Sequence, residues 1–161
     1  MARSVSTARR WLLAMAVVCF AAVGAALVSQ YALDMQPCPW CILQRLIFVV
    51  VGVLCVVAAL LSAPVARKVI TGAALVLAGS GAAAAVWQHV VAAKSASCKL
   101  TLADKVLTAL QVESIAPWLF EVKATCADAA VSLLGLPYEY WSLVLFVLLA
   151  LGAARVLAQR D

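Results

Sequence analysis

The chain has 161 residues, of which 67% are hydrophobic and only 12% are charged. A water-soluble domain carries about twice that share of charged residues, so this composition excludes an ordinary soluble globular protein. The net charge of +5 comes from lysines and arginines that stand singly or in pairs between apolar runs. Because they form no basic stripe, no nucleic-acid partner is expected.

Three uncharged stretches are long enough to cross a bilayer: residues 11–33, 46–66 and 69–93. A helix needs about 20 residues, at ~1.5 Å each, to cross ~30 Å of hydrocarbon. A fourth stretch, 140–154, is shorter, and it spans if Pro137 opens the helix and Arg155 extends its side chain toward water. The sequence therefore predicts an all-α integral membrane protein, a four-transmembrane-helix bundle.

The whole chain, 1–161, is expected to form a single membrane domain. The predicted transmembrane helices cover about 11–33, 43–63, 68–92 and 138–158. The segments between them on the far side from the N-terminus, at about 34–42 and 93–137, are the predicted external loops. The second of these is long enough to carry structure of its own.

Basic residues predict the orientation of the helices, because cytoplasmic segments are enriched in them. With the N-terminus inside, the cytoplasmic segments collect Arg3, Arg9, Arg10, Arg67, Lys68, Arg155 and Arg160. Both termini are then cytoplasmic, and the two loops face the periplasm if the cell is bacterial. The alternative is that the N-terminal run is a cleaved signal peptide. That run is longer than a usual signal core, and its removal would leave an odd number of spans.

The six cysteines divide according to this topology. Cys19 and Cys55 lie in the middle of apolar runs, where a thiol behaves as a small hydrophobic group. The other four fall in or beside the external loops: Cys38, Cys41, Cys98 and Cys126. If that side is the periplasm, its oxidising conditions allow disulfides to persist.

The motif Cys38-Pro39-Trp40-Cys41 stands at the mouth of the second predicted helix. A disulfide across this spacing closes a very small ring, which suits reversible redox chemistry better than structural stapling. Cys41 lies near a helix N-terminus, where free backbone N–H groups and the helix dipole favour a thiolate. Arg45 follows one turn later on the same face. It either stabilises that thiolate or a reduced acceptor beside it, or it anchors the helix at the membrane surface.

The long external loop contains Cys98 in a polar stretch and the aromatic-rich run Ile115–Phe120, which is too short to span. That run predicts a short helix lying on the membrane surface. Cys98 and Cys126 would then stay close to the membrane and free to move, as exchange between two thiol pairs requires. On the residues alone, a structural disulfide between these two cysteines remains open, as does a zinc site built from all four external cysteines. Four cysteines permit three pairings.

His89 is the only histidine of the chain and lies near the external end of the third predicted helix. A lone histidine at that depth either anchors the helix at the interface or handles protons. The sequence favours neither role over the other.

The segment Gln36-Pro37-Cys38-Pro39-Trp40-Cys41-Ile42-Leu43-Gln44-Arg45 resembles the bacterial disulfide bond formation protein B (DsbB) family. The resemblance extends to the four spans, the second cysteine pair and Leu134-Gly135-Leu136-Pro137 before the last helix, and so covers nearly the whole chain. It implies an inner-membrane thiol oxidoreductase that reoxidises DsbA, a periplasmic thioredoxin-like protein. The electrons would pass to ubiquinone, or to menaquinone.

The resemblance also implies roles for individual residues. DsbA would attack Cys98 and release Cys126, and exchange would then engage a disulfide between Cys38 and Cys41. Cys41 would face the quinone, and Arg45 matches the quinone-site arginine of the family. His89 falls near a quinone-site histidine of some members, although its spacing to Cys98 differs. No metal site is expected.

Three other classes compete with this reading. A vitamin K epoxide reductase-like enzyme is also a helical bundle with a quinone-facing Cys-x-x-Cys, but there the motif comes late in the chain. A four-helix membrane scaffold would use its loop cysteines only as structural staples. A metal-handling protein would bind metal with all four external cysteines and would lose its function to chelators.

Overall fold

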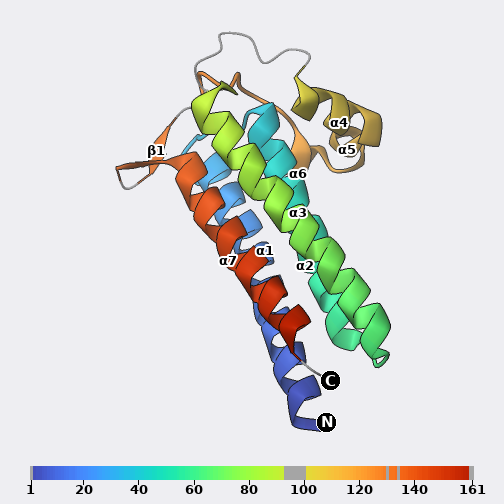
Figure 1. Cartoon of the computed structure of the whole chain (residues 1–161). Coiled ribbons are helices and arrows are strands. Elements are labelled where there is room, and N and C mark those ends of the chain that lie inside the picture. Colours follow the sequence, from blue (N-terminus) through green and yellow to red (C-terminus); the bar gives the residue numbers. More distant parts are fainter. Residues whose placement is uncertain (1, 93–100, 130, 134, 160–161) are drawn as a thin grey trace.

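The computed structural model describes residues 2–92, 101–129, 131–133 and 135–159, with side chains from Thr7 onward. Four long helices form a bundle: α1 (Ala2–Ala32), α2 (Pro39–Leu60), α3 (Pro64–Val90) and α7 (Tyr138–Ala158) (Figure 1). Three short helices and one small hairpin lie between α3 and α7 in the sequence. Within the described residues the fold is therefore helical apart from that hairpin.

All four long helices are apolar and long enough to cross a membrane. Their outward faces carry large apolar side chains at high exposure, for example Val76 at 71% and Leu148 at 57%. Apolar surface on this scale is rare on a soluble monomer, whereas in hydrocarbon it needs no cover. The predicted four-helix membrane bundle is confirmed.

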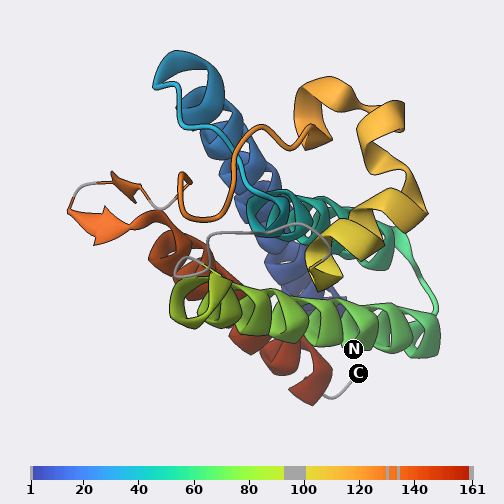
Figure 2. The same ribbon diagram turned by 90° about the horizontal axis from the view of Figure 1, so that it is seen from above.

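The helices pack in a ring. α3 packs most extensively on α7 and α1 on α2, and further contacts join α2 to α3 and α1 to α7. Both chain termini lie at one end of the bundle, and the short helices and the hairpin lie at the other (Figure 1). Seen from above, the short helices and the hairpin flank opposite sides of the bundle (Figure 2). Near the termini, the Arg155 guanidinium carbon lies 5.2 Å from the Trp11 ring centroid, a cation–π contact that joins α7 to α1.

Three of the long helices begin earlier than the expected spans, which start at about 11, 43 and 68. α1 begins at Ala2, ahead of the uncharged run. α2 begins at Pro39 and α3 at Pro64. Proline suits the first position of a helix because its missing N–H would have no partner there. At α2 the side chain of Cys38 also caps the helix, since its Sγ accepts a hydrogen bond from the Cys41 backbone N–H at 3.3 Å. The charge pattern marks the membrane-embedded part, while these local signals fix the helix starts.

The external loop contains three short helices, where the sequence predicted one at 115–120. They are α4 (Leu102–Leu110), α5 (Val112–Ile115) and α6 (Pro117–Phe120). α4 begins with a capping box in which Thr101 and Asp104 satisfy each other's backbone N–H groups. The loop helices pack on α2 through one small buried cluster: Ile42, Leu107, Val112 and Phe120. This packing fixes the loop against the mouth of α2.

A two-stranded antiparallel hairpin precedes α7. β1 (Ser132–Leu133) pairs with β2 (Leu136–Pro137), so that Ser132 lies opposite Pro137. Gly135, in the turn, has φ of 82°, a backbone conformation that favours glycine. The hairpin leads the chain directly into the first turn of α7.

The close approach of α3 and α7 depends on a small residue. A Cβ built on Gly81 would lie 2.5 Å from the ring of Phe146. That ring is fully buried and stacks on Phe48 of α2, with centroids 4.0 Å apart and planes 9° apart. The ring therefore has little room to move away from an added methyl group.

We predict that Gly81→Ala destabilises the bundle by about 1–3 kcal/mol, the usual cost of overpacking a tight core. Gly79→Ala is the matched control, because nothing lies within 4 Å of a Cβ at Gly79. There, alanine's better helix propensity should leave stability unchanged or slightly raised. Thermal unfolding of both variants in detergent measures the difference, and equal melting temperatures would contradict the packing described for α3 and α7.

Candidate functional site

Cys38 and Cys41 lie together at the mouth of α2. Their sulfur atoms are 2.8 Å apart, and the Cys38 side chain is fully buried. The hydrogen bond with Cys41 Sγ and burial are the main causes that raise the pKa of the Cys38 thiol well above its ordinary value. In the reduced pair, Cys38 therefore keeps its proton at neutral pH.

Cys41 receives a hydrogen bond from a pair of buried amides. The Gln88 Nε2 group donates to Cys41 Sγ at 3.3 Å, and the Gln44 Nε2 group donates to Gln88 Oε1 at 2.6 Å. Because the Gln88 oxygen is occupied by Gln44, its N–H group is directed at the sulfur. The two side chains come from α3 and α2, so packing of these helices assembles the donor.

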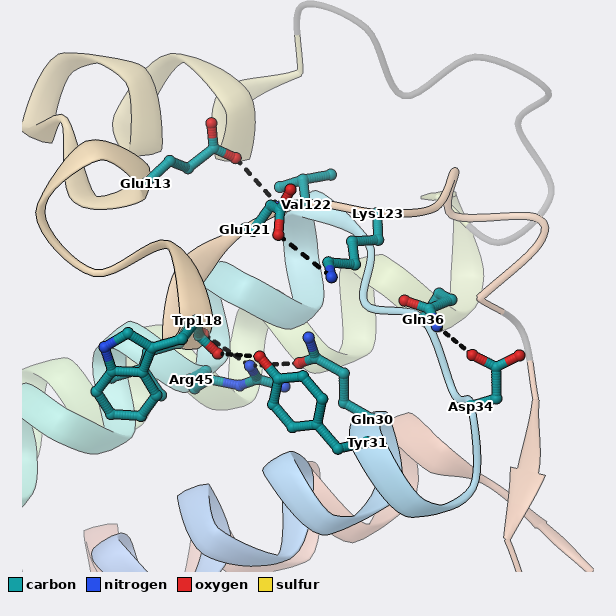
Figure 3. A network of polar contacts seen from close by, with 11 residues as sticks. Gln30, Tyr31, Asp34, Gln36, Arg45, Glu113, Trp118, Glu121, Val122 and Lys123 are labelled. Carbon is teal, nitrogen blue, oxygen red and sulfur yellow. Dashed lines mark hydrogen bonds and ion pairs between the residues drawn. The ribbon is translucent and has the colours of Figure 1, made fainter.

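Arg45 is buried, with only 5% of its surface exposed. Its Nη1 donates to Gln30 Oε1 at 2.9 Å and to the Leu119 carbonyl at 2.7 Å, which joins α1, α2 and α6 (Figure 3). Beside it, the Tyr31 hydroxyl donates to the Trp118 carbonyl at 2.7 Å. The Arg45 Nε atom, in contrast, has no hydrogen-bond partner among the described residues. The guanidinium is thus held inside the protein and keeps one donor free.

A cavity of about 260 Å³ opens beside these groups, between α1, α2 and α7. Its polar lining includes Cys41, Gln44, Arg45, Gln88 and Glu139. The rest of the wall is mainly apolar, with alanines of α1, Phe48 of α2 and Leu145 of α7. An apolar cavity with a few convergent polar groups is the usual form of a small-molecule site.

His89 does not line this cavity and is connected to it through Glu139. The His89 Nδ1 atom lies 2.8 Å from Glu139 Oε1, and its Nε2 atom lies 3.1 Å from the Tyr140 hydroxyl. The His89 side chain is 39% exposed, whereas that of Glu139 is 6% exposed. His89 therefore faces the exterior, and Glu139 faces the cavity.

The loop that carries Cys126 is tied to the Cys-x-x-Cys motif. The backbone N–H groups of Lys123 and Ala124 both donate to the Pro37 carbonyl, at 3.0 and 3.2 Å. Cys126 is buried, forms a disulfide and belongs to the same core cluster as Cys38. Cys98, the other expected loop cysteine, lies outside the described residues. Among the described residues, no group of three or more histidine, cysteine or acidic side chains is placed to hold a metal ion.

The sequence did not single out four polar residues of this site: Gln30, Gln44, Gln88 and Glu139. Each is buried and comes from a different long helix, and all four lie near the end of the bundle that carries the cysteines. A polar residue at the end of an apolar run was the available signal. It predicts burial at the helix mouth but not the partner, which depends on how the helices are rotated against each other.

Comparison with known proteins supports the resemblance seen in the sequence. The family model described as disulfide bond formation protein DsbB matches residues 8–156. Disulfide bond formation protein B of Cupriavidus metallidurans is 32% identical over 157 residues, which cover 97% of this chain and 96% of that protein. The protein of the same name from Ralstonia nicotianae is 32% identical over 158 residues, which cover 97% of this chain and 98% of that protein.

A third relative is disulfide bond formation protein B 1 of Pseudomonas syringae pv. syringae, 33% identical over 88% of this chain and 85% of that protein. No solved structure matches the chain significantly. The family match spans most of the chain, including the Cys-x-x-Cys motif, Arg45 and the greater part of each of the four long helices. The chain belongs to the DsbB family of membrane disulfide bond formation proteins.

Proposed function

We propose that this protein reoxidises a periplasmic DsbA-like dithiol protein and passes the electrons to a membrane quinone through two cysteine pairs. The observation that carries the proposal is the apolar cavity that is lined by both Cys41 and the buried Arg45. Family membership supports the disulfide chemistry, and the cavity supports a small-molecule electron acceptor. The cysteine pair at the mouth of α2 lies between that cavity and the external loop.

The cavity suits a quinone, an apolar ring whose carbonyl oxygens accept hydrogen bonds. Its wall is mostly apolar, and the unpartnered Nε of Arg45 supplies a donor. A buried donor without a partner costs about 1–3 kcal/mol, and a carbonyl oxygen in the cavity would remove that cost. When bound, the quinone supplies an acceptor for two electrons. Ubiquinone and menaquinone share this chemistry.

Within the reduced pair, the two cysteines have different roles. Cys38 holds its proton, because its raised pKa keeps it neutral. Cys41 lines the cavity and accepts the hydrogen bond from Gln88. Negative charge on Cys41 Sγ is stabilised by that donor and by the positive charge of Arg45. Cys41 is therefore the sulfur from which electrons leave the protein.

Thiol exchange brings the electrons to this pair. A thiolate of the partner attacks Cys98 and breaks its disulfide with Cys126, which leaves as a thiolate. Cys126 then attacks Cys38 and releases Cys41 as a thiolate. The partner's second thiol attacks the mixed disulfide, which closes the partner's own disulfide and releases Cys98. Cys98 then attacks Cys126, which restores the Cys98–Cys126 disulfide and leaves Cys38 as a thiol. Each step exchanges one S–S bond for another, so two thiols are oxidised and one disulfide is reduced. The hydrogen bonds from Lys123 and Ala124 to Pro37 keep the loop of Cys126 beside the motif, which supports this order of exchange.

We place the protein in the bacterial inner membrane with both termini in the cytoplasm and the redox cysteines in the periplasm. Both termini lie at one end of the bundle (Figure 1). The sequence has Arg9 and Arg10 near the N-terminus, Arg67 and Lys68 near the start of α3, and Arg155 near the end of α7. The cysteine motif, the cavity and the loop helices lie at the opposite end. This arrangement agrees with the enrichment of basic residues on the cytoplasmic side.

The role of Arg45 is tested with Arg45→Met in purified protein, with a short-chain ubiquinone as acceptor. We expect the KM for the quinone to rise at least about tenfold, as the loss of a charged hydrogen bond of about 1.5 kcal/mol predicts. Thiol exchange with the partner should continue. Tyr31→Phe is the control, because it removes the nearby hydrogen bond to Trp118 without touching the cavity lining. An unchanged KM in Arg45→Met would contradict the proposed quinone site.

The hydrogen bond from Gln88 is tested with Gln88→Leu in a Cys38→Ser background, where Cys41 is the remaining thiol of the motif. Loss of the donor should slow alkylation of Cys41 by iodoacetamide about fivefold, which corresponds to about 1 kcal/mol. Peptide mapping by mass spectrometry measures the rate at Cys41 alone. Ser80→Ala controls for a change on α3, since Ser80 bonds only to its own helix in the described structure. Equal rates in both variants would refute this role of Gln88.

A further inference from the structure

We infer that Glu139 supplies protons to the cavity, and that His89 and Tyr140 connect it to water at the external surface. This inference rests on the proposed function and adds the path by which protons reach the acceptor. It is carried by one continuous arrangement of three side chains. Glu139 lines the cavity, His89 bonds to Glu139, and Tyr140 bonds to His89.

The chemistry requires protons inside the cavity. Oxidation of two thiols to a disulfide releases two electrons and two protons, and reduction of a quinone to its quinol takes up the same number. The electrons leave through Cys41, which lines the cavity. The protons start elsewhere, on thiols of the partner and on Cys38, which is not among the described lining residues. Since an apolar wall does not conduct protons, a titratable group must carry them inward.

Glu139 is the one carboxylic acid among the described residues of the cavity wall. Arg45, which shares the wall, keeps its proton in proteins and cannot act as a donor. The phenol of Tyr138 gives up a proton far less readily than a carboxylic acid. Cys41 is occupied by the electron transfer itself. Glu139 is therefore the group suited to release a proton into the cavity and to be reprotonated.

His89 provides the reprotonation. Its two ring nitrogens face different partners, Nδ1 toward Glu139 at 2.8 Å and Nε2 toward Tyr140 at 3.1 Å. A proton taken up at Nε2 from the surface lets the ring release the proton on Nδ1 to Glu139 Oε1. An imidazole ring can accept a proton at one nitrogen while it releases one from the other, which suits transfer in both directions. His89 is more exposed than Glu139, so His89 lies toward the outer end of the path and Glu139 forms its inner end.

The competing explanation is an ion pair that only fastens α3 to α7. Glu139→Gln separates the two roles, because glutamine has the same shape and still bonds to His89 but carries no titratable proton. We expect quinone reduction by the reduced protein to slow at least about 100-fold, the usual size of a lost acid–base catalyst. Thiol exchange with the partner dithiol, followed without quinone by alkylation and mass spectrometry, should keep its wild-type rate.

Two further readouts accompany this variant. In D2O the wild type should show a solvent isotope effect on quinone reduction, and imidazole should restore part of the rate lost in His89→Gly. Glu121→Gln is the control, since Glu121 is exposed in the loop and lies outside the cavity wall. Wild-type quinone reduction in Glu139→Gln would overturn the inference. Equal losses in both half-reactions would also overturn it, in favour of a structural ion pair.

A measurement on the protein without quinone is independent of turnover. Hydrophobic carbodiimides modify protonated carboxylic acids in apolar surroundings, so dicyclohexylcarbodiimide should label Glu139 in the folded protein. The exposed Glu113 and Glu121 serve as internal controls that react instead with a water-soluble carbodiimide. Failure to label Glu139 would overturn the inference. If the wild type reduces no quinone, the proposed function fails, and this labelling still decides whether Glu139 exchanges protons with its surroundings.

Discussion

The burial of one positive charge at the mouth of α2 organises this end of the molecule. A charged arginine costs about 3 kcal/mol or more at the centre of a bilayer. Arg45 lies near the mouth of α2 but is only 5% exposed, so the protein must supply partners that compensate its charge. Gln30 of α1 and the Leu119 carbonyl of α6 supply that compensation (Figure 3). The guanidinium thereby joins two transmembrane helices and the external loop. Arg45 also lines the cavity that contains Cys41, and its Nε has no hydrogen-bond partner among the described residues.

This arrangement separates the two exchanges that the proposed function requires. In the proposed function, exchange with the partner dithiol takes place at the loop. Backbone N–H groups of this loop donate hydrogen bonds to the Pro37 carbonyl, next to the motif. Electron transfer to the acceptor belongs to the cavity, where Cys41 is enclosed by Gln88 and the ends of the helices. Cys38 stands between the two, fully buried and protonated when reduced. Under the proposed function, this arrangement keeps other thiols away from the acceptor while exchange between the two cysteine pairs continues.

The sequence predicted the parts of the fold that depend on local signals. Long uncharged runs located the four helices, and the Cys-x-x-Cys spacing located a cysteine pair whose sulfur atoms lie 2.8 Å apart. The starts of α2 and α3 at Pro39 and Pro64 were also readable from the prolines, although the charge pattern placed the spans later. In the loop, the capping box at Thr101 was a local signal for the start of α4. The prediction used only the aromatic run at 115–120 and therefore missed this helix.

Pairings between distant residues could not be predicted in this way. Gln44 and Gln88 are 44 positions apart, and His89 and Glu139 are 50 apart. Such contacts depend on the rotation of each helix about its axis, and a uniformly apolar helix carries little information about that rotation. His89, which the resemblance implied near the quinone site, bonds to Glu139 and does not itself line the cavity, and its role at that site stays a prediction. The sequence therefore indicated the depth of these residues but not their order around the cavity.

The relay is tested most directly by quinone reduction with purified protein in detergent, a reduced DsbA-like dithiol and a short-chain ubiquinone. Wild type should reduce the quinone catalytically, and Cys41→Ser and Cys98→Ser should each abolish turnover while leaving the fold intact. Absence of quinone reduction by folded wild type with any dithiol, or turnover that survives Cys41→Ser, would contradict electron flow through the two cysteine pairs.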